Sequence, residues 1–200
     1  MHKMFHFSRR AKLLFAFFAL VAAGYVGVLF VGRANGIPPS FSEARLQGAL
    51  IAQNIVNLSN ESADDLKEIN ALSSEGKYPE ALNVVLKTIE KSKEIRDEAV
   101  RLSGEMEKMT KALSEIDSAE ARQAALESIS NRLALLSRLI NYSGYLSNLL
   151  EGLRDGLLGK RPVGEITALV NQVNAEVIAI NNFNAQAGQA MDRFDAILKK

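Results

Sequence analysis

The chain has 200 residues, no cysteine and two histidines, and its formal net charge at pH 7 is +1. The absence of cysteine excludes disulfides and thiolate chemistry. Residues 1–12 carry four of the 24 Lys and Arg residues and no acid, whereas residues 33–200 carry the other 20 against all 23 acids. This longer part is weakly acidic and has no basic cluster, so no nucleic-acid partner is expected.

An uncharged run, Leu13–Gly32, dominates the first part of the chain. Twenty helical residues cover about 30 Å, which is the thickness of the hydrocarbon core of a bilayer. The run therefore predicts a transmembrane anchor, and the lipid bilayer is a predicted partner. Small residues recur within it at a spacing of four, which allows close helix packing. The residues taken to represent the anchor are Leu13, Phe17, Ala19, Ala23, Gly27 and Phe30.

The charges beside this run predict its orientation. Cationic flanks tend to stay in the cytoplasm, and only Arg33 lies close on the far side. We expect a single-pass protein of the cytoplasmic membrane, with residues 1–12 as a cytoplasmic basic tail and residues 33–200 periplasmic or extracellular. The cations that set this topology are Lys3, Arg9, Arg10 and Lys12. The alternative is a cleaved secretory signal, with small residues at Val21-Ala22-Ala23 or Gly32-Arg33-Ala34 as cleavage sites, which would release a secreted bundle.

Prolines and glycines divide the exported part into a linker and four stretches. Residues 33–40 contain Asn35, Gly36, Pro38 and Pro39 and read as a stiff juxtamembrane linker. Beyond it we predict helices over about residues 41–75, 79–115, 118–158 and 163–198. Helices joined by short turns fold back on one another. The predicted fold is thus all-α, with the transmembrane helix followed by an antiparallel up-down-up-down four-helix bundle over residues 41–200.

Apolar periodicity supports the four helices. In the second stretch, residues from Leu82 to Ile116 recur at alternating spacings of three and four, and residues from Ile166 to Leu198 do the same in the fourth. This pattern keeps one seam of each helix facing a partner, as in coiled coils and bundles. Gly76 and Gly159 are predicted to close the first and third helices. Asp117 with Glu120 resembles a capping box at the start of the third.

The third stretch is the most apolar of the four. Between Leu133 and Leu150 its only charge is Arg138. One interpretation is a buried helix that contacts two neighbours over a wide face. The other is an exposed apolar strip that binds a protein partner or a second copy of the chain. The candidate partner surface consists of Leu135, Leu139, Tyr142, Tyr145, Leu146 and Leu149.

The residue types argue against catalysis. His2 and His6 both precede the anchor, so the exported part has neither histidine nor cysteine. This excludes Ser–His and Cys–His nucleophiles and histidine-containing metal sites in the bundle. The acid pairs Asp64-Asp65 and Asp97-Glu98 lie among lysines and are predicted to be a solvated surface. We therefore expect no catalytic residues, no cofactor and no metal, and a protein that is not an enzyme.

The expected function is a binding, tethering or scaffolding module outside the cytoplasmic membrane, with a protein partner or self-association. An anchored four-helix bundle also resembles the ligand-sensing input domains of bacterial chemoreceptors. That resemblance is one of architecture alone and implies an extracytoplasmic sensor or ligand-binding subunit. Those receptors have a second membrane span, and no second apolar run is found in this sequence.

Overall fold

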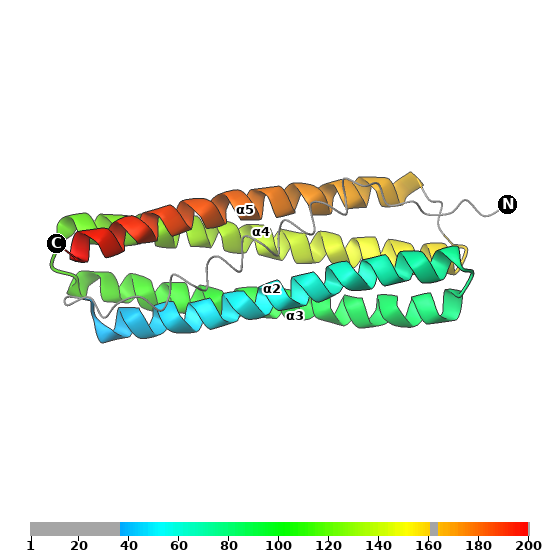
Figure 1. Cartoon of the computed structure of the whole chain (residues 1–200), viewed down its shortest axis with the longest axis horizontal. Helices are drawn as coiled ribbons and strands as arrows, with labels where there is room; N and C mark the ends of the chain where they lie inside the picture. Colours follow the sequence, from blue (N-terminus) through cyan, green and yellow to red (C-terminus); the bar gives the residue numbers. More distant parts are fainter. Residues whose placement is uncertain (1–36, 161–163, 200) are drawn as a thin grey trace.

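A computed structural model describes residues 37–160 and 164–199 of the chain (Figure 1). These residues form four long α-helices and no strand, which confirms the all-α prediction. The helices are α2 (Pro39–Ser74), α3 (Tyr78–Ala112), α4 (Ala119–Leu157) and α5 (Gly164–Leu198), and a short 3-10 helix η1 (Leu113–Glu115) follows α3. Each long helix ends within about three residues of its predicted bounds.

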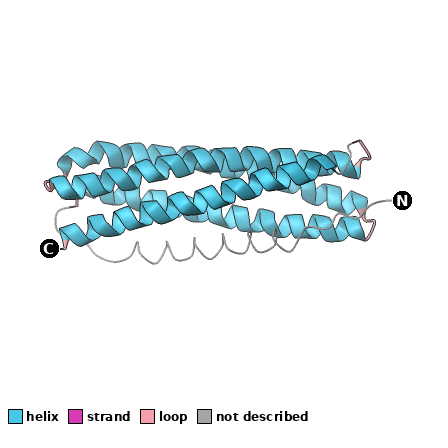
Figure 2. Ribbon diagram, turned by 90° about the horizontal axis from the view of Figure 1, so that it is seen from above, coloured by secondary structure: helices cyan, strands magenta, loops and turns pink. Residues whose placement is uncertain are grey.

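The four helices alternate in direction and form a slender antiparallel bundle (Figures 1 and 2). Helices of 35 to 39 residues are about 53–59 Å long at 1.5 Å per residue. Each of the first three packs extensively on the next along the chain. The start of α2 and the end of α5 lie at the same end of the rod, and the α2–α3 turn lies at the other.

The predicted anchor lies outside the described residues. This holds for the run Leu13–Gly32, with its residues Leu13, Phe17, Ala19, Ala23, Gly27 and Phe30, and for the tail cations Lys3, Arg9, Arg10 and Lys12. Within the described residues, none of the helices is long and apolar enough to cross a bilayer.

The helix ends follow local chemistry. Gly76 and Gly159 have φ angles of 77° and 71°, a left-handed conformation that glycine adopts without strain, so both predicted helix ends are confirmed. The N-cap of α4 is Ser118 rather than Asp117, because the Ser118 hydroxyl accepts a hydrogen bond from the Ala121 N–H at 3.2 Å. Helix α2 begins at Pro39, so the predicted linker is shorter than residues 33–40 by its last two positions.

The core follows the predicted seams. In α3 the buried positions of the seam run from Val85 to Met109, and in α5 they run from Val173 to Phe194. At one contact between α4 and α5, the Ser128 hydroxyl donates to the Ala187 carbonyl at 2.9 Å. A hydroxyl reaches the backbone of a neighbouring helix only where the two backbones approach closely. The small side chains of the fully buried Ala187 and Ala190 permit that approach.

Candidate functional site

The structure places the predicted partner surface of α4 in the bundle core. Tyr142, Leu146 and Leu149 are 1%, 0% and 1% exposed, and Leu139 is also buried. Leu135 and Tyr145 are half-buried and pack against the same core. The expectation that these six residues form an exposed strip is therefore corrected. They lie where the other interpretation put them, because α4 packs on both α3 and α5 and needs a wide apolar face.

The exposed apolar residues of α4 are different ones. Leu126, Leu133 and Ile140 are 45%, 48% and 41% exposed. They are spaced by seven residues, and this spacing returns a helix to nearly the same face. A stripe of exposed aliphatic side chains thus follows the outer side of α4. Around the helix axis, this stripe is rotated by about a third of a turn or more from the predicted partner surface.

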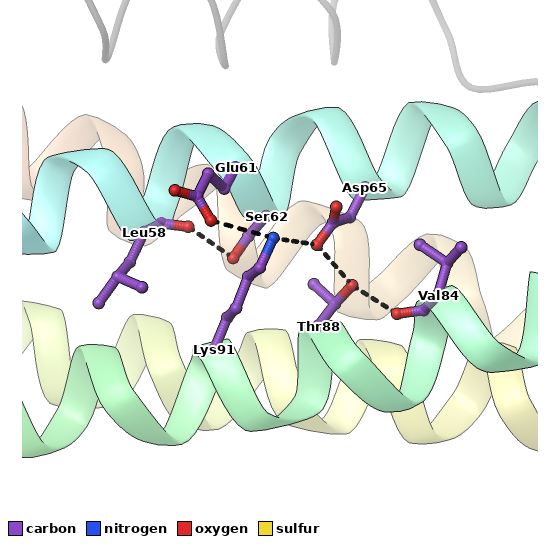
Figure 3. A network of polar contacts seen from close by, with 7 residues as sticks. All are labelled: Leu58, Glu61, Ser62, Asp65, Val84, Thr88 and Lys91. Atoms are coloured by element: carbon purple, nitrogen blue, oxygen red, sulfur yellow. Dashed lines mark hydrogen bonds and ion pairs between the residues drawn. The ribbon is translucent and has the colours of Figure 1, made fainter.

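A polar network joins α2 and α3 in the half of the rod that is nearer the α2–α3 turn (Figure 3). The Lys91 ammonium of α3 contacts Asp65 Oδ2 at 2.8 Å and Glu61 Oε2 at 3.1 Å, both on α2. The Thr88 hydroxyl lies 2.9 Å from the same Asp65 oxygen and 2.8 Å from the Val84 carbonyl. The Lys91 and Asp65 side chains are only 24% and 18% exposed. Asp65 is therefore not the solvated surface residue that its sequence context predicted.

The electrostatics of this network favour a structural role. Burial by itself lowers the pKa of Lys91, but the hydrogen bonds and charges of Asp65 and Glu61 outweigh burial and raise it. Lys91 therefore stays protonated at neutral pH. A lysine has to lose its proton before it can act as a nucleophile or a base, so this one links the two helices instead.

A second polar link joins the first and last described helices. Arg45 of α2 forms two parallel hydrogen bonds with Asp195 of α5, at 2.7 and 2.8 Å. Beside this pair, the rings of Phe41 and Phe194 lie 5.2 Å apart between centroids. Together the four side chains connect the start of α2 to the end of α5.

Two polar side chains of α4 are also buried in the core. Arg132 of α4 is 7% exposed, and burial lowers its pKa to about 10, so it stays charged at neutral pH. Burial also raises the pKa of the Tyr142 hydroxyl above its ordinary value, and a hydrogen bond with Ser59 opposes that shift only in part. Both residues have the spacing of core positions in α4, and only their polar ends would have drawn attention to them.

An open groove of about 530 Å³ lies between α3 and α4. It is lined by Leu86, Lys87, Ile89, Glu90, Lys93, Glu151 and Arg154. Among the described residues, no three His, Cys, Asp or Glu side chains gather as metal ligands would. The groove is a mixed apolar and charged surface without a convergent set of catalytic groups.

Comparisons with known proteins assign no relative. No protein-family model, no curated protein and no solved structure matches this chain. The function is therefore argued from the geometry and the residue types alone.

Proposed function

We propose that this chain is a single-pass membrane protein whose helical bundle binds, tethers or scaffolds a partner outside the cytoplasmic membrane. The bundle has no chemistry of its own in this proposal. The observation that carries it is the position of the start of α2 at one end of a rod about 55 Å long. The apolar run and the basic tail immediately precede that end in the sequence.

The chemistry of the bundle supports a binding role. Its sequence has no histidine or cysteine, and the partly buried Lys91 and the buried Arg132 keep their protons at neutral pH. General acid–base catalysis uses groups that gain or lose protons near the working pH. A rod of four long helices suits the positioning of another macromolecule.

Single cysteines test the membrane topology, because the natural chain contains none. We expect Lys77→Cys, in the exposed α2–α3 turn, to react with a membrane-impermeant maleimide in intact cells. The matched variant His6→Cys, in the predicted cytoplasmic tail, should react only after lysis. The protein should also stay in the membrane pellet at alkaline pH. Labelling of both variants before lysis, or release at alkaline pH, would refute the anchored topology.

The mature N-terminus separates the anchor from the signal-peptide alternative. An uncleaved chain that begins at Met1 keeps its tether. A chain that begins near Gly24 or Asn35 is a secreted bundle, and the tethering role then fails. Edman sequencing or intact mass of the protein purified from its native host distinguishes the two.

A ligand-sensing role is the second candidate, and the groove between α3 and α4 is the observation that favours it. Three cations, Lys87, Lys93 and Arg154, and two acids, Glu90 and Glu151, line it beside the exposed Leu86. This lining suits a zwitterionic small molecule with an apolar part. A ligand of this kind should raise the Tm of the full chain. The rise should disappear in Lys87→Ala but persist in Lys108→Ala, which changes a cation of α3 outside the groove.

A further inference from the structure

Exposed aliphatic side chains repeat regularly on only one helix of the described bundle. On α4, Leu126, Leu133 and Ile140 recur every seven residues. On α2 the two exposed leucines are four residues apart, on α3 the charged Lys93 lies midway between the two exposed aliphatic residues, and α5 has one. A partner helix can follow side chains that repeat every seven residues over several turns. This repeat distinguishes α4 from the other three helices.

Small residues alternate with the large ones along this stripe. Ser130, Ser137 and Gly144 are exposed, and each follows a large residue by four positions. They share a sector of about 80° around the helix axis with the large residues. An added Cβ at Gly144 would meet nothing within 4 Å, so the space beside it is open to a neighbour. The α4 stripe is defined here as Leu126, Ser130, Leu133, Ser137, Ile140 and Gly144.

Charges close to the α4 stripe lie at its two ends. Arg122 precedes the stripe and the exposed Glu151 follows it on the same side of α4, and Arg122 Nη1 also donates to two backbone carbonyls. The two charges between these ends, Glu127 and Arg138, each form an ion pair with a residue of α5. Arg138 is rotated by about 80–160° around the axis from the stripe residues. The stripe thus begins beside a cation and ends beside an acid.

We propose that two copies of the chain pair in antiparallel orientation along the α4 stripe. In the register that sets Leu133 of one copy opposite Ser137 of the other, Leu126 lies opposite Gly144, and the remaining large and small residues match in the same way. Every large side chain then meets a small one, and the two-fold axis repeats each contact. A parallel pair would set large residues against large ones and Gly144 against Gly144. This order of large and small residues complements itself, which is the reason to infer a second copy as the partner.

The charges at the ends of the stripe agree with this register. Arg122 of one copy lies within about three residues, or about 4.5 Å of axial rise, of Glu151 of the other copy. Complementary charges across an interface fix its register and orientation. In a parallel pair, Arg122 would meet Arg122 and Glu151 would meet Glu151.

The contact between the two copies is small. The stripe is about 27 Å long and a helix is about 10 Å wide, so each copy offers a footprint of about 270 Å². Stable specific interfaces bury at least about 1,200 Å² in total, so the pairing is weak in dilute solution. Copies held in one membrane meet at a high effective concentration, and in this respect the inference rests on the proposed function. A two-fold axis along the membrane normal relates two antiparallel rods when both lie along the surface.

Single cysteines in the full-length, cysteine-free chain test the register in native membranes. Copies with Leu126→Cys and differently tagged copies with Gly144→Cys should form a mixed disulfide-linked dimer under mild oxidation, at least about tenfold more than either variant forms with itself. The two positions are about 27 Å apart along α4, so antiparallel copies bring them together and parallel copies do not. In the control, Leu50→Cys on the exposed side of α2 replaces Leu126→Cys. Dimers of each variant with itself, or a mixed yield no greater than the control, overturn the proposal.

A charge exchange inside the stripe separates pairing from folding. The register sets Ser130 opposite Ile140, so Ser130→Glu or Ile140→Lys, introduced into both copies, should each reduce the mixed dimer by at least about tenfold. The double variant should restore the dimer, because each Glu then faces a Lys of the other copy. The two positions are about 15 Å apart in one helix, so the new charges do not pair within a copy. Loss of the dimer in the double variant, with helicity unchanged, overturns the proposal.

The two proposals fail in different ways. A chain that stays in the membrane pellet but gives no mixed dimer contradicts the interface and not the anchor. A chain that gives the mixed dimer but leaves the pellet contradicts the proposed function and not the interface. A chain that fails both measurements contradicts both.

Discussion

Arg45 and Asp195 are 150 residues apart in the sequence and form a two-pronged ion pair between α2 and α5. Their side chains are 12% and 19% exposed. Removal of one partner leaves a largely buried charge unpaired, which is costlier than the loss of a surface pair. We expect Asp195→Asn to lower the free energy of unfolding by about 1–3 kcal/mol, measured by urea denaturation followed at 222 nm.

The neighbouring exposed pair provides the control for this prediction. Arg193 and Glu127 contact each other at 2.6 Å with side chains 58% and 45% exposed. Exposed pairs contribute less than about 1 kcal/mol, so Arg193→Gln should change the stability little. If both variants lose the same amount, Arg45 and Asp195 do not act as a buried pair.

The contacts of Lys91 are partly buried, so their loss should lower the free energy of unfolding more than the loss of an exposed ion pair does. Asp65→Asn should destabilise the bundle at pH 7 by about 1–2 kcal/mol, since it weakens the contacts of both Lys91 and Thr88. Lys67→Met breaks a 2.6 Å pair with Asp64 whose side chains are 56% and 75% exposed. It should cost less than about 0.5 kcal/mol. If the two variants lose the same free energy of unfolding, the contacts of Asp65 contribute no more than an exposed ion pair.

The raised pKa of Tyr142 predicts a loss of stability at high pH. The unfolded chain releases this phenolic proton near pH 10, whereas the folded chain retains it to higher pH because burial disfavours the phenolate. The unfolded state therefore binds fewer protons above about pH 10, and stability falls there by up to about 1.4 kcal/mol per pH unit. Tyr142→Phe should show a shallower fall between pH 9.5 and 11 than the natural chain. If the stability of the two proteins falls equally between pH 9.5 and 11, the phenol of Tyr142 is not the cause of the fall.

Two glycines in helices should respond in opposite ways to a larger residue. An added Cβ at Gly104 would meet nothing within 4 Å, so Gly104→Ala should stabilise α3 by about 0.5–1 kcal/mol through helix propensity. At Gly48 an added Cβ would already lie 3.2 Å from Met106 Cε and 3.3 Å from Leu102 Cδ1. Gly48→Leu should therefore destabilise the bundle by about 1–3 kcal/mol through overpacking. A neutral Gly48→Leu would show that α2 and α3 are less closely packed than described.

Local patterns were sufficient to predict the helices, their order and most of the core. The seam of α3 is an example, since alternating spacings of three and four from Val85 to Met109 match buried positions. Periodicity shows which residues share a helix face, but it does not show which neighbouring helices cover that face. For this reason Tyr142 and Leu149 were candidates for a partner surface, whereas the exposed positions proved to be Leu133 and Ile140.

The polar contacts between helices could not be predicted in the same way. The Arg45–Asp195 pair and the contacts of Lys91 depend on the relative register of two helices, which the spacing within either helix does not fix. The low charge of α5 was visible in the sequence. Residues 166–191 contain the single charge Glu176, and this paucity of charge in a predicted surface helix is a signal that apolar periodicity alone overlooks.

The direction of the helices also determines where the rod can carry added parts. The start of α2 and the end of α5 share one end, and the turn at Gly76 lies at the other. A fluorescent reporter or epitope fused after Lys200 would stay beside the predicted linker. The same insert placed at Gly76 would lie about 55 Å away, at the other end of the rod. Labels at these two positions would therefore report how far each end of the bundle stands from a surface.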